Sequence, residues 1–379
     1  MIHWRTATVE SVRSEWPGVR EVWARLDTPL PGREDAGEPV RALAYTDLVG
    51  TPEVGDALVL NVSALARGLG TGGFALVVAL PEALPADPAP GPGHLVKDRY
   101  SPTQTMVLGI DDQESEHHGV LARARSIEEM PVVVADLHSA LPAVLAGLRA
   151  EAPDARVVYV MTDGAALPLP FSRAVAGLKE AGWLTGTITV GQAWGGDHEA
   201  VTVHSALLAA KHVLGADVVV VSQGPGNLGT GTPFGFSGMV VGDHLNAVGA
   251  LEGVPVALPR MSNADLRGRH AGISHHTLTA VGRGALVTCR VPLPDFSTLA
   301  DAERAQCAAD PVEIVDLVRA QKAALAHHAF AEIDLTGLWE ALGASPVTLS
   351  TMGRGLTEDP ASFLAAAATG RYVATLLGD

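Results

Sequence analysis

The sequence predicts an α/β protein: a doubly wound, mainly parallel sheet flanked by helices, preceded by a small N-terminal β-barrel domain of the OB or SH3-like kind. Two observations support this. Up to residue 80, short apolar runs are separated by Gly and Pro turn signals. After residue 101, apolar strand-like runs alternate with Ala- and Leu-rich helix-like runs, which is typical of parallel strands joined by crossover helices.

The N-terminal region shows four strand-like runs, namely VWARLD, VRALAYTDL, DALVLNVSAL and FALVVAL. Their spacing suits a small barrel over residues 1–80, with an exposed loop at Arg33–Glu38. The barrel lacks the basic and aromatic surface of a nucleic-acid reader, so we expect a structural or assembly role for it. The proline-rich stretch PEALPADPAPGPGH then predicts a linker over residues 81–100, followed by an α/β domain over 101–379.

The α/β domain is predicted to contain seven strands and a comparable number of helices. The predicted strands are Thr105–Ile110, Val132–Ala135, Arg156–Met161, Thr187–Val190, Asp217–Ser222, Val254–Leu258 and Ala285–Val291. The predicted helices are Ser139–Ala150 with Ser139 as a cap, Phe171–Ala181, Glu199–Leu214, a stretch within Ser237–Leu251, Pro311–Phe330, Leu335–Leu342 and one beginning at Pro360. Gly182 and Gly215 follow helices, where a left-handed stop is expected, and Val347–Ser350 is a candidate strand.

Composition limits the classes of partner and compartment. The chain of 379 residues is 47% hydrophobic, 18% charged and carries a net charge of −16, which disfavours nucleic acid or an anionic membrane as the main partner. Two cysteines are too few for a disulfide framework or a cysteine-type zinc site. With no signal peptide and no apolar run long enough to span a membrane, we expect a cytoplasmic location.

Ligands of open α/β sheets bind at the carboxyl ends of the strands. The residues that directly follow the predicted strands are therefore candidates for a site. Asp136 and His138 follow the second predicted strand, Asp163 the third and His198 the fourth. A glycine-rich loop follows the fifth, and a basic, His-rich segment over residues 260–276 follows the sixth.

The glycine-rich loop, SQGPGNLGTGTPFGFSG, allows three interpretations. Gly224, Gly226 and Gly229 match the dinucleotide pattern G-x-G-x-x-G, but no helix is expected at the third glycine and the later acidic residue is missing. Alternatively, the loop binds an anion through backbone amides, with Asn227, Thr230 and Gly231 contributing. The third interpretation is a turn needed only for packing or for a subunit contact.

The segment over 260–276 favours the anion interpretation, because arginine side chains suit carboxylate and phosphate groups. Its candidate ligand-binding residues are Arg260, Arg267, Arg269 and His270. The alternative is a solvated loop whose arginines pair with Asp265 and Glu252.

Histidine can act as an acid, a base or a metal ligand near neutral pH. The candidate catalytic residues are His275, His276, Asp136 and Asp163. A divalent metal is a further hypothesis, with Asp136, His138 and His198 as its candidate ligands. No local metal-binding spacing and no nucleophile motif accompany these residues.

Several stretches resemble a known family. GDALVLNVSALARGLGTGGFALVVA, GHLVKDRYSPTQ, SQGPGNLGTGTPFGFSG and ADLRGRHAGISHHTLTA are similar to DUF3866, an uncharacterised bacterial family common in actinobacteria. The resemblance covers nearly the whole chain and implies no activity.

The sequence leads to one main functional hypothesis and three alternatives. The main hypothesis is an enzyme that acts on a small anionic metabolite, for example a phosphorylated one, and forms a homo-oligomer. The alternatives are a non-catalytic ligand sensor, a homomeric assembly protein and a nucleotide-binding protein with an atypical glycine loop. The cofactor is not specified by any motif.

Overall fold

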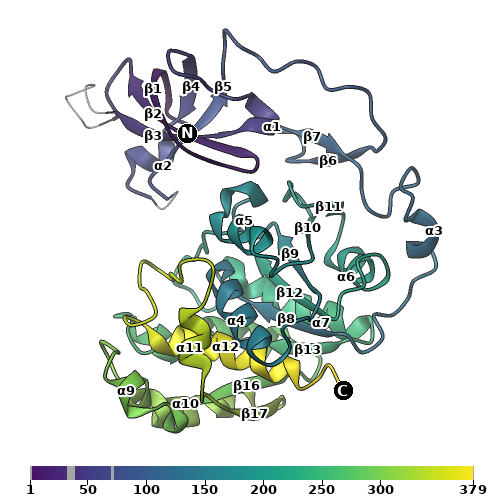
Figure 1. Ribbon diagram of the computed structural model, residues 1–379, viewed down its shortest axis with the longest axis vertical. Helices are drawn as coiled ribbons and strands as arrows, with labels where there is room; N and C mark the ends of the chain where they lie inside the picture. Colours follow the sequence, from purple (N-terminus) through teal and green to yellow (C-terminus); the bar gives the residue numbers. More distant parts are fainter. Residues whose placement is uncertain (1, 32–38, 70–71, 379) are drawn as a thin grey trace. The chain divides into compact units, whose positions relative to one another are not determined.

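The computed structural model describes residues 2–31, 39–69 and 72–378. The described residues form two compact units (Figure 1). The first comprises residues up to Pro92 and Val96–Met106, and the second comprises Gly93–Leu95 and residues from Val107 onward. The expected loop at Arg33–Glu38 lies outside the described residues. The linker was expected over residues 81–100; residues 81–94 contain no helix or strand, whereas Leu95–Lys97 form the short strand β6.

The first unit is a closed five-stranded barrel in the order β1-β2-β3-β5-β4, which confirms the predicted N-terminal barrel. Its strands are β1 (Trp4–Trp16), β2 (Val19–Leu26), β3 (Val40–Tyr45), β4 (Ala57–Asn61) and β5 (Ala75–Ala79), with short helices α1 (Thr46–Val49) and α2 (Ser63–Ala66). Alternate residues such as Ala7, Val9, Val22, Ala24 and Leu58 point inward and form its core. Closure pairs β1 with β4, so neither strand presents a free edge.

The second unit contains an all-parallel eight-stranded sheet in the order β11-β10-β9-β12-β8-β13-β16-β17. This confirms the predicted α/β class. The strands are β8 (Pro131–Ala135), β9 (Val157–Thr162), β10 (Gly186–Val190), β11 (His198–Ala200), β12 (Val218–Gln223), β13 (Val254–Ala257), β16 (Arg290–Asp295) and β17 (Ala329–Asp334).

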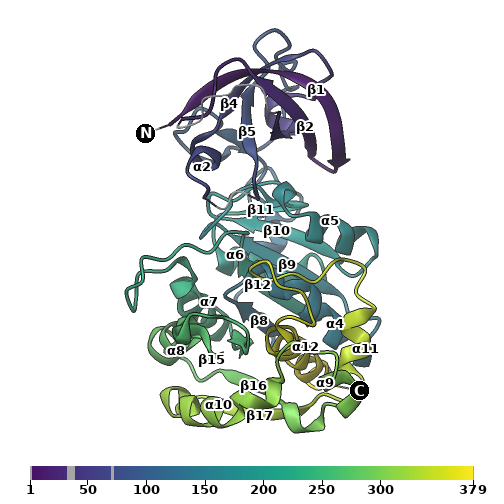
Figure 2. The same ribbon diagram turned by 90° about the vertical axis from the view of Figure 1, so that its left-hand side faces the viewer.

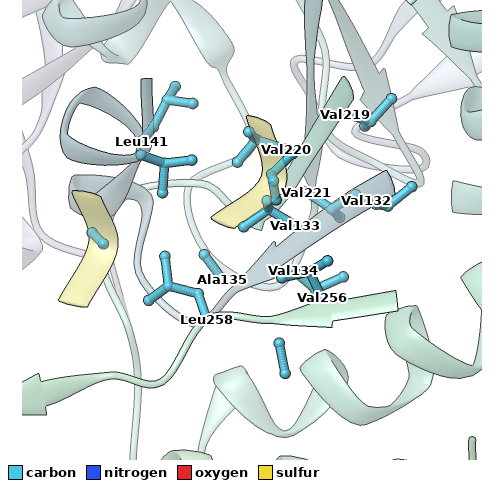
Figure 3. Close-up of a cluster of buried hydrophobic side chains, with 14 of the residues drawn as sticks. Val132, Val133, Val134, Ala135, Leu141, Val219, Val220, Val221, Val256 and Leu258 are labelled. Carbon is cyan, nitrogen blue, oxygen red and sulfur yellow. The ribbon is translucent and has the colours of Figure 1, made fainter. Parts of the chain in front are cut away.

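The centre of this sheet is buried on both faces, which explains its unbroken valine runs. Val133 of β8 lies opposite Val220 of β12 on one side and Val256 of β13 on the other. Figure 3 shows these side chains packed together with Leu141 and Leu258.

Helices cover both faces of the sheet (Figure 2). On one face, α4 (Leu141–Glu151) packs against α11 (Leu338–Gly343) and α12 (Pro360–Ala374), and α5 (Arg173–Glu180) follows β9. On the other face lie α6 (Val203–His212), α7 (Val240–Ala250) and α8 (His275–Thr279). Shorter elements are α3 (His118–Leu121), α9 (Asp301–Arg304), α10 (Val315–Gln321) and the two-stranded sheet of β14 (Met261–Ser262) and β15 (Gly272–Ile273).

Two glycines allow helices α4 and α12 to approach each other closely. A Cβ at Gly147 of α4 would lie 1.9 Å from the carbonyl oxygen of Ala367, and one at Gly370 of α12 would lie 2.0 Å from that of Val144. The two helices therefore approach backbone to backbone, which larger side chains at these positions would prevent.

Several predicted elements are wrong in detail. The predicted first strand, Thr105–Ile110, is only β7 (Thr105–Val107), which pairs with β6 (Leu95–Lys97) outside the eight-stranded sheet. Residues Glu199 and Ala200, predicted to be helical, belong to the edge strand β11. The predicted helix Pro311–Phe330 ends before residue 329, where β17 begins, and Val347–Ser350 forms no strand.

Two smaller differences have local causes. Ser139 does not cap α4, because it lies inside a 3₁₀ turn (His138–Ala140) and its hydroxyl donates instead to Thr351 Oγ1 at 3.1 Å. The strand predicted at Ala285–Val291 is shifted to Arg290–Asp295. By contrast, Gly182 and Gly215 have φ angles of 69° and 62°, which confirms the predicted left-handed stops.

Candidate functional site

The candidate site lies where the direction of the sheet connections reverses. The chain leaves β8 toward α4 on one face and leaves the neighbouring β12 toward α7 on the other. The loops after β8, β12 and β13 therefore diverge at the carboxyl ends of adjacent strands, which is the usual ligand position in open α/β sheets. These three loops contribute Asp136, Asn227 and Arg260, respectively.

Asp136 is the centre of this site. Its carboxylate is 4% exposed; Oδ1 accepts a hydrogen bond from Asn227 Nδ2 at 2.7 Å, and Oδ2 accepts from Arg260 Nη1 and His276 Nδ1, both at 3.0 Å. Burial alone would raise the pKa of Asp136, but the His276 hydrogen bond and the Arg260 charge outweigh it and lower the pKa. Asp136 is therefore a buried, ionised acceptor.

His276 Nδ1 lies 3.0 Å from Asp136 Oδ2 and 3.1 Å from Arg260 Nη1. Because the ionised Asp136 carboxylate can only accept, Nδ1–H is assigned as donor to it, and the ring lone pair is then on Nε2. The ring also stacks on Phe236, with centroids 3.9 Å apart and planes at 7°. This arrangement leaves Nε2 as the nitrogen that can accept a proton or bind a metal.

Two further histidines adjoin His276. The rings of His270, His275 and His276 lie with centroids 4.4–5.1 Å apart. His270 is buried, and its Nδ1 lies 2.8 Å from the hydroxyl of Ser274, the residue that caps α8. Burial, with the charges of Arg260 and Arg267, lowers the pKa of His270 to about 3. Burial and then the neighbouring His276 also lower the pKa of His275, so both rings are neutral at pH 7.

The three arginines of the segment have different surroundings. Arg260 is buried in the ion pair with Asp136. Arg267 forms a bidentate pair with Asp265, at 2.9 and 2.7 Å, and is thereby neutralised. Arg269 is exposed beside His270, and no carboxylate of the described residues lies within ion-pair distance of it. Of the three, Arg269 has the guanidinium that an incoming anion could contact.

The glycine-rich loop is a tight exposed turn. Gly229 and Phe236 form an isolated antiparallel β-bridge, and the Thr230 amide donates to the Gly235 carbonyl oxygen. Gly226 and Gly231 have positive φ angles of 100° and 79°. The backbone amides of Gly226, Gly229 and Gly231 have no acceptor among the described residues.

Gly224 has a different role from the other glycines, because a Cβ there would lie 2.2 Å from the carbonyl oxygen of Ala166. The first helical turn after β12 begins only at Ser237, so no helix opens at Gly229 as the dinucleotide pattern would need.

Three other candidates lie apart from Asp136. Asp163 is exposed after β9 and accepts the amide of Gln192 at 2.8 Å. His138 lies between Tyr159 and Ser172, at 2.8 and 2.6 Å, and burial lowers its pKa to about 4. His198 is on the edge strand β11, with its ring 6.3 Å from that of His117.

The metal-ligand set suggested by the sequence, Asp136 with His138 and His198, is therefore not brought together. The physical reason is that the chain enters a 3₁₀ turn at His138, so Asp136 and His138 do not share a strand face.

Two site residues have no useful sequence signal. Phe236 is one of several apolar residues of its loop, and nothing in the sequence distinguishes it from Phe234, which is exposed. Gly238 approaches Asp136 so closely that a Cβ there would lie 1.7 Å from Oδ1. Ser274 could have been found, because a serine directly before a short helix is a typical N-cap.

Among the described residues, no helix is long and apolar enough to cross a membrane. No curated protein and no solved structure matches the chain. The model of a family described as a protein of unknown function (DUF3866) matches residues 41–370, which is most of the sequence. The chain therefore belongs to the DUF3866 family of proteins of unknown function.

Proposed function

We propose that this protein is an enzyme that acts on a small anionic substrate at the carboxyl ends of β8, β12 and β13. The observation that carries the proposal is the hydrogen bond from His276 Nδ1 to the buried Asp136 carboxylate. Such a carboxylate fixes the tautomer and the orientation of the ring and leaves the lone pair on the opposite nitrogen, which is the arrangement that general-base and metal-ligand histidines share. His276 Nε2 is the working atom of the proposed site.

The anionic character of the substrate is supported by the balance of charge. Asp136 and Asp265 neutralise Arg260 and Arg267, whereas Arg269 keeps its charge. The loop amides of Gly226, Gly229 and Gly231 are additional donors that suit phosphate or carboxylate oxygens. A guanidinium hydrogen-bonded to an anion contributes about 1.5–3 kcal/mol, or roughly tenfold or more in affinity.

Anion binding is tested by titrating chelator-treated protein with inorganic phosphate and with malonate in a calorimeter. We expect Arg269→Gln to weaken the binding of at least one probe by about tenfold or more. The matched control Arg267→Gln should change it by less than about twofold, because that side chain is already paired with Asp265. If neither probe binds, or if both variants bind like the wild type, the substrate is not an anion held by Arg269.

Catalysis is tested by turnover of a panel of aryl phosphate monoesters, aryl phosphodiesters and aryl carboxylate esters. His276→Gln should lower kcat by about a hundredfold or more. The exposed His327 supplies the control His327→Gln, which should keep full turnover. Equal rates in His276→Gln and the wild type, or no turnover of any member of the panel, would count against an enzyme of this kind.

A second candidate function, homomeric assembly, is favoured by the apolar tip of the glycine-rich loop. Leu228 and Phe234 are 71% and 58% exposed. If this tip is a subunit contact, Phe234→Ser should convert an oligomer to monomers in size-exclusion chromatography. The control Leu286→Ser, which changes a leucine elsewhere that is even more exposed, at 86%, should leave the oligomer intact. A monomeric wild type would remove this function.

A further inference from the structure

Three histidines come together in the described part of the chain with their ring nitrogens converging. One nitrogen from each of His270, His275 and His276 lies within 4.8 Å of the others. We propose that these three side chains bind one divalent transition-metal ion of the zinc class, which would supply the Lewis acid of the site. Only the catalytic role of the ion rests on the proposed function. Binding of the ion can be measured without any substrate.

The groups behind the histidines are those that metal-ligating imidazoles use. His276 donates Nδ1–H to the Asp136 carboxylate, and His270 has Nδ1 2.8 Å from Ser274 Oγ. In both rings Nε2 is then the nitrogen left for an ion; in His270 it accepts from Arg269 Nε at 3.4 Å, a contact that the ion would replace. A carboxylate or hydroxyl behind a ligating histidine fixes its tautomer and orientation, and such partners are a regular feature of zinc centres.

The third ring is the one that can move. Tetrahedral coordination at a Zn–N distance of about 2.0–2.1 Å separates two ligand nitrogens by about 3.3 Å. Nitrogens up to 4.8 Å apart must therefore approach by at most about 1.5 Å. His275 is half-buried and its side chain has no hydrogen bond to any described residue, so its rotation toward an ion breaks none.

Three imidazoles leave one tetrahedral position for water or substrate. No cysteine or carboxylate of the described residues joins this group, so its donor set resembles that of catalytic rather than structural zinc. An imidazole that ligates a metal is neutral, so the three ligands would add no charge, and Asp136 cancels Arg260. The ion would therefore add two positive charges beside Arg269, and this excess agrees with an anionic ligand in the fourth position.

A second group of side chains that could hold a metal ion must be distinguished from the three histidines. His94, Asp112 and Glu114 also lie within 4.8 Å of one another, but His94 and Glu114 are exposed, and His94 already contacts Asp112 at 3.2 Å. Exposed acidic groups of this kind are common without an ion. They supply a useful control for where an added metal binds.

The test is a titration of chelator-treated full-length protein with Co²⁺, followed by visible absorption, and with Zn²⁺ in a calorimeter, both without phosphate. We expect one equivalent to bind with the absorption bands of tetrahedral cobalt. His275→Ala should lose the bands and weaken Zn²⁺ binding by about tenfold or more, because one of three ligands is missing. His270→Gln is the second variant, and circular dichroism verifies that each variant is folded.

Two controls locate the ion. His327→Ala removes an exposed histidine outside the cluster, and Asp112→Asn removes the centre of the exposed group; both should keep the bands and the stoichiometry. The proposal is overturned if the wild type gives no tetrahedral bands, if both cluster variants bind like the wild type, or if Asp112→Asn abolishes binding. The phosphate titration uses metal-free protein. A failure of metal binding therefore leaves the result on anion binding unaffected, and a failure of anion binding leaves the result on metal binding unaffected.

Discussion

Gly238→Ala tests whether the Asp136 carboxylate controls the site. A Cβ at residue 238 would lie 1.7 Å from Asp136 Oδ1, whereas ordinary contact begins near 3.4 Å, so the carboxylate must retreat by about 1.7 Å. Its hydrogen bonds to Asn227, Arg260 and His276, at 2.7–3.0 Å, cannot survive a shift of that size. The variant keeps the charged groups of Asp136 and Arg260 but moves them apart.

The expected effects follow from the loss of a buried ion pair. Breaking such a pair costs about 3–5 kcal/mol, which for a unit of this size lowers Tm by about 6–10 °C. Loss of the group behind a ligating histidine should also weaken Co²⁺ binding by about 10–100-fold. The assays are a thermal melt and the cobalt titration.

Gly268→Ala is the matched control for this experiment. It lies in the segment that carries Arg267 and Arg269, and a Cβ there meets no atom within 4 Å. We expect it to melt and bind Co²⁺ like the wild type. If Gly238→Ala behaves in the same way, the Asp136 carboxylate does not hold His276 in place, and the site described above is misassigned.

Two further predictions concern stability. His138 has a folded-state pKa of about 4 because of burial, against about 6.5 when unfolded, so the unfolded chain takes up a proton first as the pH falls. His138 should therefore contribute a decline in stability of about 3 kcal/mol between pH 6.5 and 4; urea melts across this range should show a decline, and His138→Gln should make it shallower without removing it, because the lowered pKa of His270 acts in the same direction. A slope that persists unchanged in His138→Gln would contradict this assignment. Gly147→Ala should destabilise the α4–α12 contact by about 1–3 kcal/mol or more, because its Cβ meets a carbonyl oxygen at 1.9 Å. Gly343→Ala, with open space around its Cβ, should be neutral or stabilising in the same melt; equal melting of the two would refute the close approach.

The sheet was predictable because its strands are buried on both faces. Runs such as Val218–Val221 leave little alternative to a central parallel strand, and the Ala- and Leu-rich segments between them suit crossover helices. Two of the errors fall on the edge strands of the sheet, β11 and β17. β17 is at the sheet edge, with only Ile333 among its residues buried, so its sequence lacks a strand pattern that could outweigh the preceding helical one.

The sequence predicted that the candidate site lies at the ends of strands, but not which side chains meet there. Asp136, Asn227, Arg260 and His276 meet because β8, β12 and β13 are neighbours, but strand order cannot be derived from local patterns. Asp265 could be named from the sequence as a partner for the arginines of this segment, but the sequence could not say for which. Arg267 and Arg269 are alike in sequence, and only the fold shows that Asp265 pairs with Arg267.

The strand order also bears on how the chain folds as it is synthesised. β8 and β9 follow each other along the sequence, yet β12 lies between them in the sheet. The centre of the sheet therefore cannot form until Gln223 has left the ribosome, about ninety residues after the start of β8. Until then, the valine-rich edges of β8 and β9 lack their native neighbour, which makes this interval the period in which the nascent chain most needs protection from aggregation.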